Sequence, residues 1–331
     1  MMAHLHVERQ DRPFAFFAAG FLGVLAVIYA GTVAESRISP AEISPEAGQS
    51  TIAVVTRTIS DARSMVRAFD EIGYTLDEVR NGGRVPRVLV TRLPADLDSI
   101  QAVDRRKAAF AQALLPLILI VDETIAGQRR ELVRLRDLKA AGVPFSEQQD
   151  AWLGDLARQY AVADRDIDKL LLKVDIIPPS LALAQAIEES GWGTSYFARH
   201  GNALFGQRAW GDAAKGLEPV TQQAGGTAFK VQSFPWVLDA VRAYVQNLNS
   251  HPAYAELRRV RAQMRARGEM PDGYTLAGAL TSYSERGADY ISTIRFLMRE
   301  NDLSAFDRAK LNAPELVNLI DHVKRGTPPT S

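Results

Sequence analysis

The hydrophobic positions of this 331-residue chain begin with an uninterrupted apolar run near its N-terminus. Residues 14–34 contain no charged side chain, and a helix of this length spans about 30 Å, the thickness of a bilayer's hydrocarbon core. Arg9 and Arg12 precede the run, and basic residues before a span favour a cytoplasmic N-terminus. We therefore predict that residues 1–34 are a transmembrane anchor. A cleaved signal peptide is the alternative, although its apolar core is usually shorter.

The pattern after the anchor predicts a tether and then a helical region. Residues 35–50 are rich in Ser, Pro and Glu, which is typical of a linker. Residues 51–163 contain no motif with a readable chemistry, and their role stays open. Their apolar periodicity predicts helices near 61–71, 76–80 and 100–138, with a strand-like piece over 84–93.

The long helix expected over 100–138 raises the question of a second membrane span. Its apolar segment, residues 108–121, is too short to cross a bilayer and is bounded by charged residues. The segment also holds Pro116, which disrupts helix interiors. We therefore expect a buried core helix with Pro116 as a candidate kink.

Beyond residue 163, helical patterns surround one strand-like segment. Residues 164–302 read as a helical domain with a break at Pro178-Pro179. Within 211–235, Gly225-Gly226 marks a turn and alternating apolar and polar residues follow, so we predict a small β-hairpin. Residues 303–331 are expected to form one C-terminal helix and a tail. The predicted fold class is mainly α.

Composition narrows the classes of function. The chain carries 39 Lys and Arg against 39 Asp and Glu, and this balance argues against a nucleic-acid partner. It contains no cysteine, which excludes a thiol nucleophile, a cysteine-based zinc site and disulfides. The five histidines show no metal-ligand spacing, so we expect neither a metal nor a cofactor.

Two adjacent carboxylates, Glu188 and Glu189, are the first candidates for chemistry. Neighbouring residues on a helix point about 100° apart, so the two side chains have different surroundings. Glu188 borders the apolar stripe, whereas Glu189 shares a face with Ala182, Gln185 and Ala186. Small neighbours leave space for a ligand, which makes Glu189 the better candidate to face a cleft. Two solvated carboxylates near a helix end are the alternative.

Three motifs around these residues carry a resemblance. They are Ala184-Gln185-Ala186, then Glu189-Ser190-Gly191-Trp192-Gly193, and then Asn202-Ala203-Leu204-Phe205-Gly206. In this order they resemble the glucosaminidase domain of glycoside hydrolase family 73, whose members cleave bacterial peptidoglycan. Residues 247–254 and 283–295, together with the expected anchor, are most similar to Bax-type exported glucosaminidases of Gram-negative bacteria. The similarity covers about residues 165–300.

The resemblance implies a lysozyme-like α+β domain over 164–302 and an endo-β-N-acetylglucosaminidase activity. It makes Glu189 the catalytic acid and leaves Glu188 structural. Such an acid must still hold its proton near neutral pH, whereas an ordinary glutamic acid has lost it. A water-poor cleft beside Trp192 would raise the pKa of Glu189 as required.

A second carboxylate is normally needed as base or nucleophile, and the family places it on the hairpin. Between Gly206 and Asp239 the chain offers only Asp212 and Glu218, and we select Glu218. A more distant acid, or the substrate's own N-acetyl group, is the alternative. The resemblance also implies a tyrosine that positions sugar or water, either Tyr283 or Tyr290, with core packing as the other reading of each.

Four further residues are expected to bind or shape the substrate cleft: Gln185, Trp192, Asn202 and Phe205. Trp192 has two open roles, packing beneath the acid or stacking on a sugar ring.

The implied partners are peptidoglycan glycan strands and, through the N-terminal helix, the membrane. We expect a single-pass inner-membrane protein with its catalytic domain in the periplasm, or a secreted protein if the signal is cleaved. A muramidase or lytic transglycosylase, and a non-catalytic wall-binding or regulatory protein, remain alternative functions.

Overall fold

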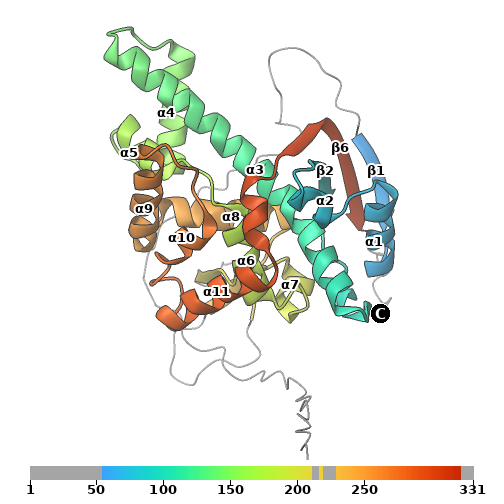
Figure 1. The fold of residues 1–331 in the computed structure, drawn as a ribbon. Helices are drawn as coiled ribbons and strands as arrows, with labels where there is room; N and C mark the ends of the chain where they lie inside the picture. Colours follow the sequence, from blue (N-terminus) through green and yellow to red (C-terminus); the bar gives the residue numbers. More distant parts are fainter. Residues whose placement is uncertain (1–53, 211–215, 219–228, 322–331) are drawn as a thin grey trace, which may run out of the picture.

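The computed structural model describes residues 54–210, 216–218 and 229–321. The expected anchor and tether, residues 1–50, lie outside the described residues, as does Asp212. The described chain is mainly helical, with two small three-stranded sheets, one of which lies to the right of the helical body in Figure 1. The predicted mainly α class is therefore confirmed for this part of the chain.

Helix α6, Pro179–Ser190, lies at the centre of the helical body (Figure 1). It begins at the second of two prolines, where the missing N–H costs no helical hydrogen bond, and ends at Gly191 in the left-handed conformation. All of its residues are buried except Glu188 and Glu189. The elements that pack around it are α3 (Val103–Ala140), α10 (Gly273–Ala277), α11 (Ala288–Glu300) and the 3₁₀ turn η4 (Leu303–Arg308).

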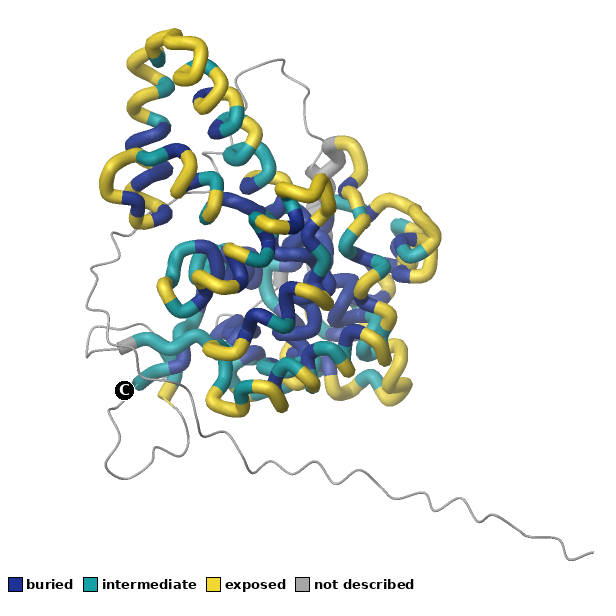
Figure 2. The backbone as a smooth tube through the Cα atoms, turned by 60° about the vertical axis from the view of Figure 1, so that its left-hand side comes forward, coloured by how far each residue is buried: buried dark blue, intermediate teal, exposed yellow. Residues whose placement is uncertain are grey.

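Helix α3, Val103–Ala140, is the long helix expected from the sequence. It continues through Pro116 and packs against both α6 and the strand β2. Among the described residues, α3 alone is long and apolar enough to cross a membrane, and 78% of its most apolar stretch is buried inside the protein. This burial confirms the expected core helix. Its C-terminal half and α4, Glu147–Gln159, project as an arm that is largely exposed (Figure 2).

The first sheet joins the two ends of the described chain. Strand β6, Leu311–Asp321, lies between β1, Val54–Ile59, and β2, Val85–Val90, and both pairings are parallel. The C-terminal helix expected within 303–331 is therefore wrong over these residues. The helical reading of 51–163 also missed β1, while the strand-like piece over 84–93 is confirmed as β2.

The physical reason for this error is that the partners of β6 are remote in sequence. A short apolar stretch such as 316–320 fits a helix and a buried strand equally well by periodicity. Pro314 also argues against a central strand, because proline has no N–H for the ladder. The register against β2 shifts between Leu311 and Leu316, so Pro314 falls in the irregular part.

The second sheet confirms an antiparallel pairing within 211–235 and adds a strand, while the predicted turn at Gly225-Gly226 lies outside the described residues. Strands β3, Arg208–Trp210, and β4, Gly216–Leu217, both pair antiparallel with β5, Phe229–Gln232. A Cβ on Gly216 would lie 2.5 Å from the Val231 carbonyl oxygen, so a side chain there would push β4 away from β5.

The remaining helical elements complete the body around α6. They are α1 Ala62–Glu71, α2 Leu76–Arg80, α5 Ile167–Lys173, α7 Tyr196–Gly201, α8 Val237–Ser250, α9 Ala255–Ala266, α10 Gly273–Ala277 and α11 Ala288–Glu300, with the 3₁₀ turns η2 Leu97–Ser99, η3 Pro252–Tyr254 and η4 Leu303–Arg308. Helices α1 and α2 confirm two of the helices expected from the sequence.

A buried polar network holds residues 172–176, the segment that leads into α6, in place. Arg261 on α9 is 1% exposed, and its guanidinium donates to backbone carbonyls of Leu172, Lys173, Asp175 and Ile176 and to the side chain of Asn249. Asp175 accepts two bonds from Arg265. Burial alone would raise the pKa of Asp175, but Arg265, Arg261 and Arg129 together hold it below its usual value.

Removing the Arg261 donors should destabilise the fold. Arg261→Met keeps an apolar stem but strands several buried carbonyls, so the free energy of unfolding should fall by about 3–5 kcal/mol. Urea unfolding of the full chain in detergent micelles measures this. Arg259→Met on the same helix breaks only an exposed pair with Glu256 and should leave the midpoint in place. Equal midpoints for both variants would show that the network does not stabilise the fold.

Candidate active site

The chain turns sharply after Glu189, and three consecutive left-handed residues make the turn. Gly191, Trp192 and Gly193 have φ values of 56°, 58° and 75°. The Ser190 hydroxyl accepts a hydrogen bond from the Gly193 N–H at 2.9 Å. A Cβ on Gly193 would lie 2.9 Å from side-chain atoms of both Leu93 and Phe110, so glycine is required at this close approach.

Trp192 packs against α3. Its ring meets Phe110 edge-to-face with 5.9 Å between the ring centroids, and Lys107 Nζ lies 5.2 Å from the ring centre. The sequence left packing beneath the acid and stacking on a sugar ring open; the packing seen here is against α3, and the choice between those two roles stays a prediction. The neighbour that Trp192 packs on is α3, so the water-poor surroundings of Glu189 come from other residues.

The carboxyl group of Glu189 lies between α11 and the turn at Gly206. Glu189 Oε1 accepts a hydrogen bond from the Tyr290 hydroxyl at 3.1 Å. Glu189 Oε2 lies 3.0 Å from the point where a Cβ on Gly206 would stand, so the missing side chain leaves room for the carboxyl. As a whole residue Glu189 is half-buried, and its carboxyl group is the buried part.

Burial raises the pKa of Glu189 to about 7. The Tyr290 hydrogen bond and the positive charge of Arg286 oppose this rise in pKa, while the negative charge of Glu188 adds to it. A carboxyl group with this pKa is still protonated in a large fraction of molecules at neutral pH. It can therefore act as a general acid.

Glu188 has a different partner. Its Oε1 accepts a hydrogen bond from Arg286 Nη1 at 2.6 Å, and Arg286 also donates to the Thr293 hydroxyl. The two neighbouring carboxylates thus have different hydrogen-bond partners and surroundings, as the helical geometry predicted.

Four tyrosines surround Glu189, and the sequence pointed to two of them. Tyr283 and Tyr290 stack with 5.3 Å between ring centroids, and Tyr254 lies 5.8 Å from Tyr283. Burial raises the pKa of Tyr254 to about 12 and raises the pKa of Tyr244, Tyr283 and Tyr290 well above the usual value. All four hydroxyls therefore keep their protons. Tyr254 ends the similar stretch 247–254, which could have pointed to it, whereas the pattern around Tyr244 on α8 holds no such signal.

Three predicted substrate-binding residues are instead buried behind this group. Gln185 has no exposed surface, because its amide bonds Tyr290 and Tyr244. The Asn202 side chain donates to the carbonyls of Phe234 and Pro235 and is 1% exposed. Phe205 stacks on Tyr244 at 4.0 Å, and its carbonyl accepts a bond from Tyr283. Of the two roles expected for these side chains, binding or shaping the cleft, their burial favours shaping it.

Glu218 follows β4 directly and is exposed. The adjacent Leu217 lies close to α7, since its Cδ1 would be 3.0 Å from a Cβ on Gly201. The small sheet therefore sits beside the segment that carries Asn202, Phe205 and Gly206. Among the described residues, no hydrogen bond or ion pair joins Glu218 to Glu189.

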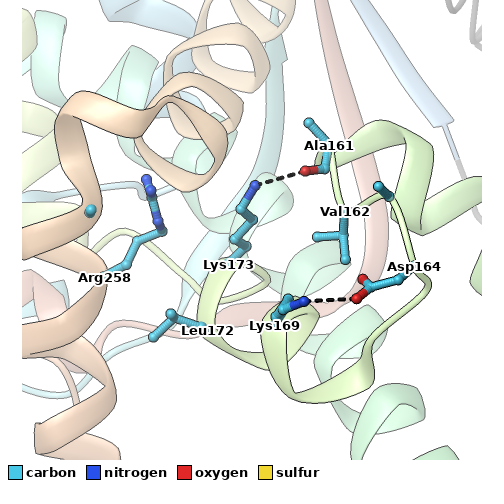
Figure 3. Close-up of a pocket in the computed structure, with 9 residues that line it drawn as sticks. Ala161, Val162, Asp164, Lys169, Leu172, Lys173 and Arg258 are labelled. Carbon is cyan, nitrogen blue, oxygen red and sulfur yellow. Dashed lines mark hydrogen bonds and ion pairs between the residues drawn. The ribbon is translucent and has the colours of Figure 1, made fainter.

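A separate cavity of about 320 Å³ lies between α5, the start of α9 and the turn before α5 (Figure 3). Lys173 donates to the carbonyls of Tyr160 and Ala161, and Lys169 pairs with Asp164. Its lining contains neither Glu189 nor the four tyrosines, and these lysines are already bonded, so we assign it no chemistry. Among the described residues, no group of three or more His, Asp or Glu side chains could hold a metal ion.

Comparison with known proteins identifies the part of the chain that carries Glu189, the four tyrosines and the small sheet as a glucosaminidase domain. The family model for mannosyl-glycoprotein endo-beta-N-acetylglucosaminidase matches residues 165–303. The chain is 32% identical over 212 residues to Protein bax of Escherichia coli (strain K12), covering 62% of this chain and 73% of that protein. It therefore belongs to the family of Bax-type glucosaminidase-domain proteins.

A solved structure, the catalytic domain of the autolysin Auto from Listeria monocytogenes, is also similar. It covers 52% of this chain and 96% of its own, with 17% identity and a TM-score of 0.32.

The raised pKa of Glu189 should make the stability depend on pH. The folded protein holds this proton up to about pH 7, whereas the unfolded chain loses it near pH 4.5. Stability is therefore lost as the pH rises between these values, by about 3 kcal/mol in full. Glu189→Gln removes this loss, so the variant should exceed wild type in stability at pH 8 and match it at pH 4.

Urea unfolding at the two pH values measures this effect. Glu188→Gln is the control, because it breaks the bond with Arg286 and should bring no gain at pH 8. A Glu189→Gln variant that is destabilised equally at both pH values would contradict the assignment of a buried, proton-holding carboxyl.

Proposed function

We propose that this protein is a peptidoglycan hydrolase of the endo-β-N-acetylglucosaminidase type, with Glu189 as its general acid. The observation that carries the proposal is a carboxyl group whose burial raises its pKa to about 7 and which accepts a hydrogen bond from the Tyr290 hydroxyl inside the matched domain. The family of the chain supports the same class of substrate.

The chemistry requires a proton at the leaving-group oxygen of the glycosidic bond. Glu189 delivers it from the protonated form, which is present in about half of the molecules at pH 7 if the pKa is about 7. The carboxylate that remains is stabilised by the Tyr290 hydrogen bond and by the positive charge of Arg286. The same residue then removes a proton from an incoming group.

Glu218 is proposed as the second carboxylate, which activates water or attacks the sugar. Its exposure at the end of β4 and the contact of that strand with α7 support the role. The substrate's N-acetyl group is the alternative nucleophile. The proposed location is the periplasm, with residues 1–34 holding the chain in the inner membrane; the charge-free run 14–34 supports it.

Glu189→Gln should abolish lysis of purified peptidoglycan. Loss of a general acid lowers the rate by roughly 10²–10⁴-fold, since the amide has no proton to give at this acidity. Turbidity of wall suspensions measures the rate for the full chain in detergent. Glu188→Gln is the matched control and should change the rate by less than about threefold, because its carboxyl is engaged by Arg286.

The sugar at the newly formed end of each product shows which glycosidic bond is cut. After borohydride reduction, a glucosaminidase leaves N-acetylglucosaminitol ends, a muramidase leaves muramitol ends, and a lytic transglycosylase leaves anhydromuramic ends. Either of the last two would overturn the glucosaminidase assignment. Binding to wall without lysis by wild type would instead support a wall-binding protein.

Glu218→Gln should lower the rate of lysis by at least about tenfold while leaving the unfolding midpoint in place, because an exposed residue contributes little to stability. Glu285→Gln, another exposed carboxylate in the loop before α11, is the control and should retain most of the activity. An active Glu218→Gln variant would assign the second step to the substrate's acetamido group or to another acid.

A further inference from the structure

A chain of three hydrogen bonds leads from α8 to the carboxyl of Glu189. The Tyr244 hydroxyl donates to Gln185 Oε1 at 2.7 Å, and Gln185 Nε2 donates to the Tyr290 hydroxyl at 3.0 Å. The Tyr290 hydroxyl donates to Glu189 Oε1 at 3.1 Å. Tyr244 and Tyr290 are 1% exposed and Gln185 is fully buried, so bulk water does not compete for these bonds.

The direction of these hydrogen bonds is set at the buried end of the network, at Tyr244. A phenol has one proton to donate, and a carboxamide donates only through nitrogen and accepts only through oxygen. Among the described residues, Gln185 Oε1 is the acceptor that the Tyr244 hydroxyl has. If the Gln185 amide turned over, the Tyr244 proton would lose this acceptor where no water replaces it, and that is unfavourable.

The donor-to-acceptor direction of these hydrogen bonds decides which oxygen of Glu189 carries the acidic proton. Because Oε1 accepts from Tyr290, the proton of the neutral acid belongs on Oε2, the oxygen that lies beside Gly206 and points away from the tyrosine. If the hydrogen bonds ran in the opposite direction, Tyr290 would donate to Gln185, and Glu189 would direct its proton inward to the Tyr290 oxygen. A proton held there could not reach a glycosidic oxygen.

We propose that Tyr244 and Gln185 are positioning residues, which fix the direction of the Tyr290 hydroxyl and so keep the acidic proton of Glu189 on Oε2. They act through Tyr290 and do not touch the reacting atoms. The inference rests on Glu189 being the acid of the proposed function. It assigns Gln185 a role that differs from substrate binding, and it gives Tyr244 a role that its place on an apolar helix face did not suggest.

The groups that face Glu189 are one ion pair and four tyrosines. The titratable groups that face it are Glu188, Arg286, Tyr244, Tyr254, Tyr283 and Tyr290. The tyrosines stay neutral because burial raises each pKa, and Glu188 is paired with Arg286. A change at Tyr244 therefore alters the hydrogen bonds of Glu189 without altering the charge around it.

The test is Tyr244→Phe, which keeps the ring that stacks on Phe205 and removes the hydroxyl. The Gln185 amide is then free to turn, and the ionised Glu189 loses part of the Tyr290 hydrogen bond that favours it. We expect kcat to fall roughly tenfold with KM nearly unchanged. The alkaline limb of the pH–rate profile should move up by about one pH unit, because the acid keeps its proton longer.

Two further variants separate positioning from packing. Gln185→Met should move the same limb, and the double variant with Tyr244→Phe should move it no further, since both act through one chain. Tyr160→Phe is the control: Tyr160 is also buried and also donates to a glutamine, Gln128, but outside the site. It should leave the limb in place.

Carboxyl NMR titration of the full chain labelled with ¹³C-glutamate reads the pKa of Glu189 without any turnover, and Glu189→Gln assigns the signal. An unchanged pKa and an unchanged pH limb in Tyr244→Phe would overturn the positioning role. If wild type hydrolyses no wall material, the proposed function fails, but the titration still decides whether Tyr244 acts on Glu189.

Discussion

The packing of α6 is the constraint on which the rest of the structure depends. Every residue from Pro179 to Ile187 is buried, so the helix has no freedom to roll or slide within the body. Its last turn then presents Glu188 and Glu189 in directions set by the helix itself. One carboxylate meets Arg286 at the surface and the other enters a group of tyrosines, and this difference in surroundings separates a surface ion pair from a carboxyl group whose pKa is raised by burial.

Local sequence was enough to find the features that local physics determines. The break at Pro178-Pro179 and the glycines on both sides of Trp192 gave the start and the end of α6. Glu189 followed from the periodicity of the helix and from the motifs around it. The strand alternation near residue 229 was also correct, because a short antiparallel pairing needs only a turn and its neighbours.

The missed features are the ones that depend on partners far away in the chain. Tyr244 lies 59 residues from Gln185, and its aromatic ring on an apolar helix face reads as ordinary core until the acceptor is known. Gln185 was read as a ligand-facing amide, although two tyrosines from other helices enclose it. The strand β6 looked helical because neither β1 nor β2 is near it in sequence. Periodicity records the face that a residue presents, but not what covers that face.

The central place of β6 has a consequence for the order in which the molecule is built. During synthesis β1 and β2 emerge early, and each has an open hydrogen-bonding edge until the strand between them arrives. The glucosaminidase helices have all been synthesised by then, so the sheet forms last. Its strands β1 and β2 are separated from β6 by a long stretch of sequence. The sheet can therefore be complete only after every described element of the chain has been translated.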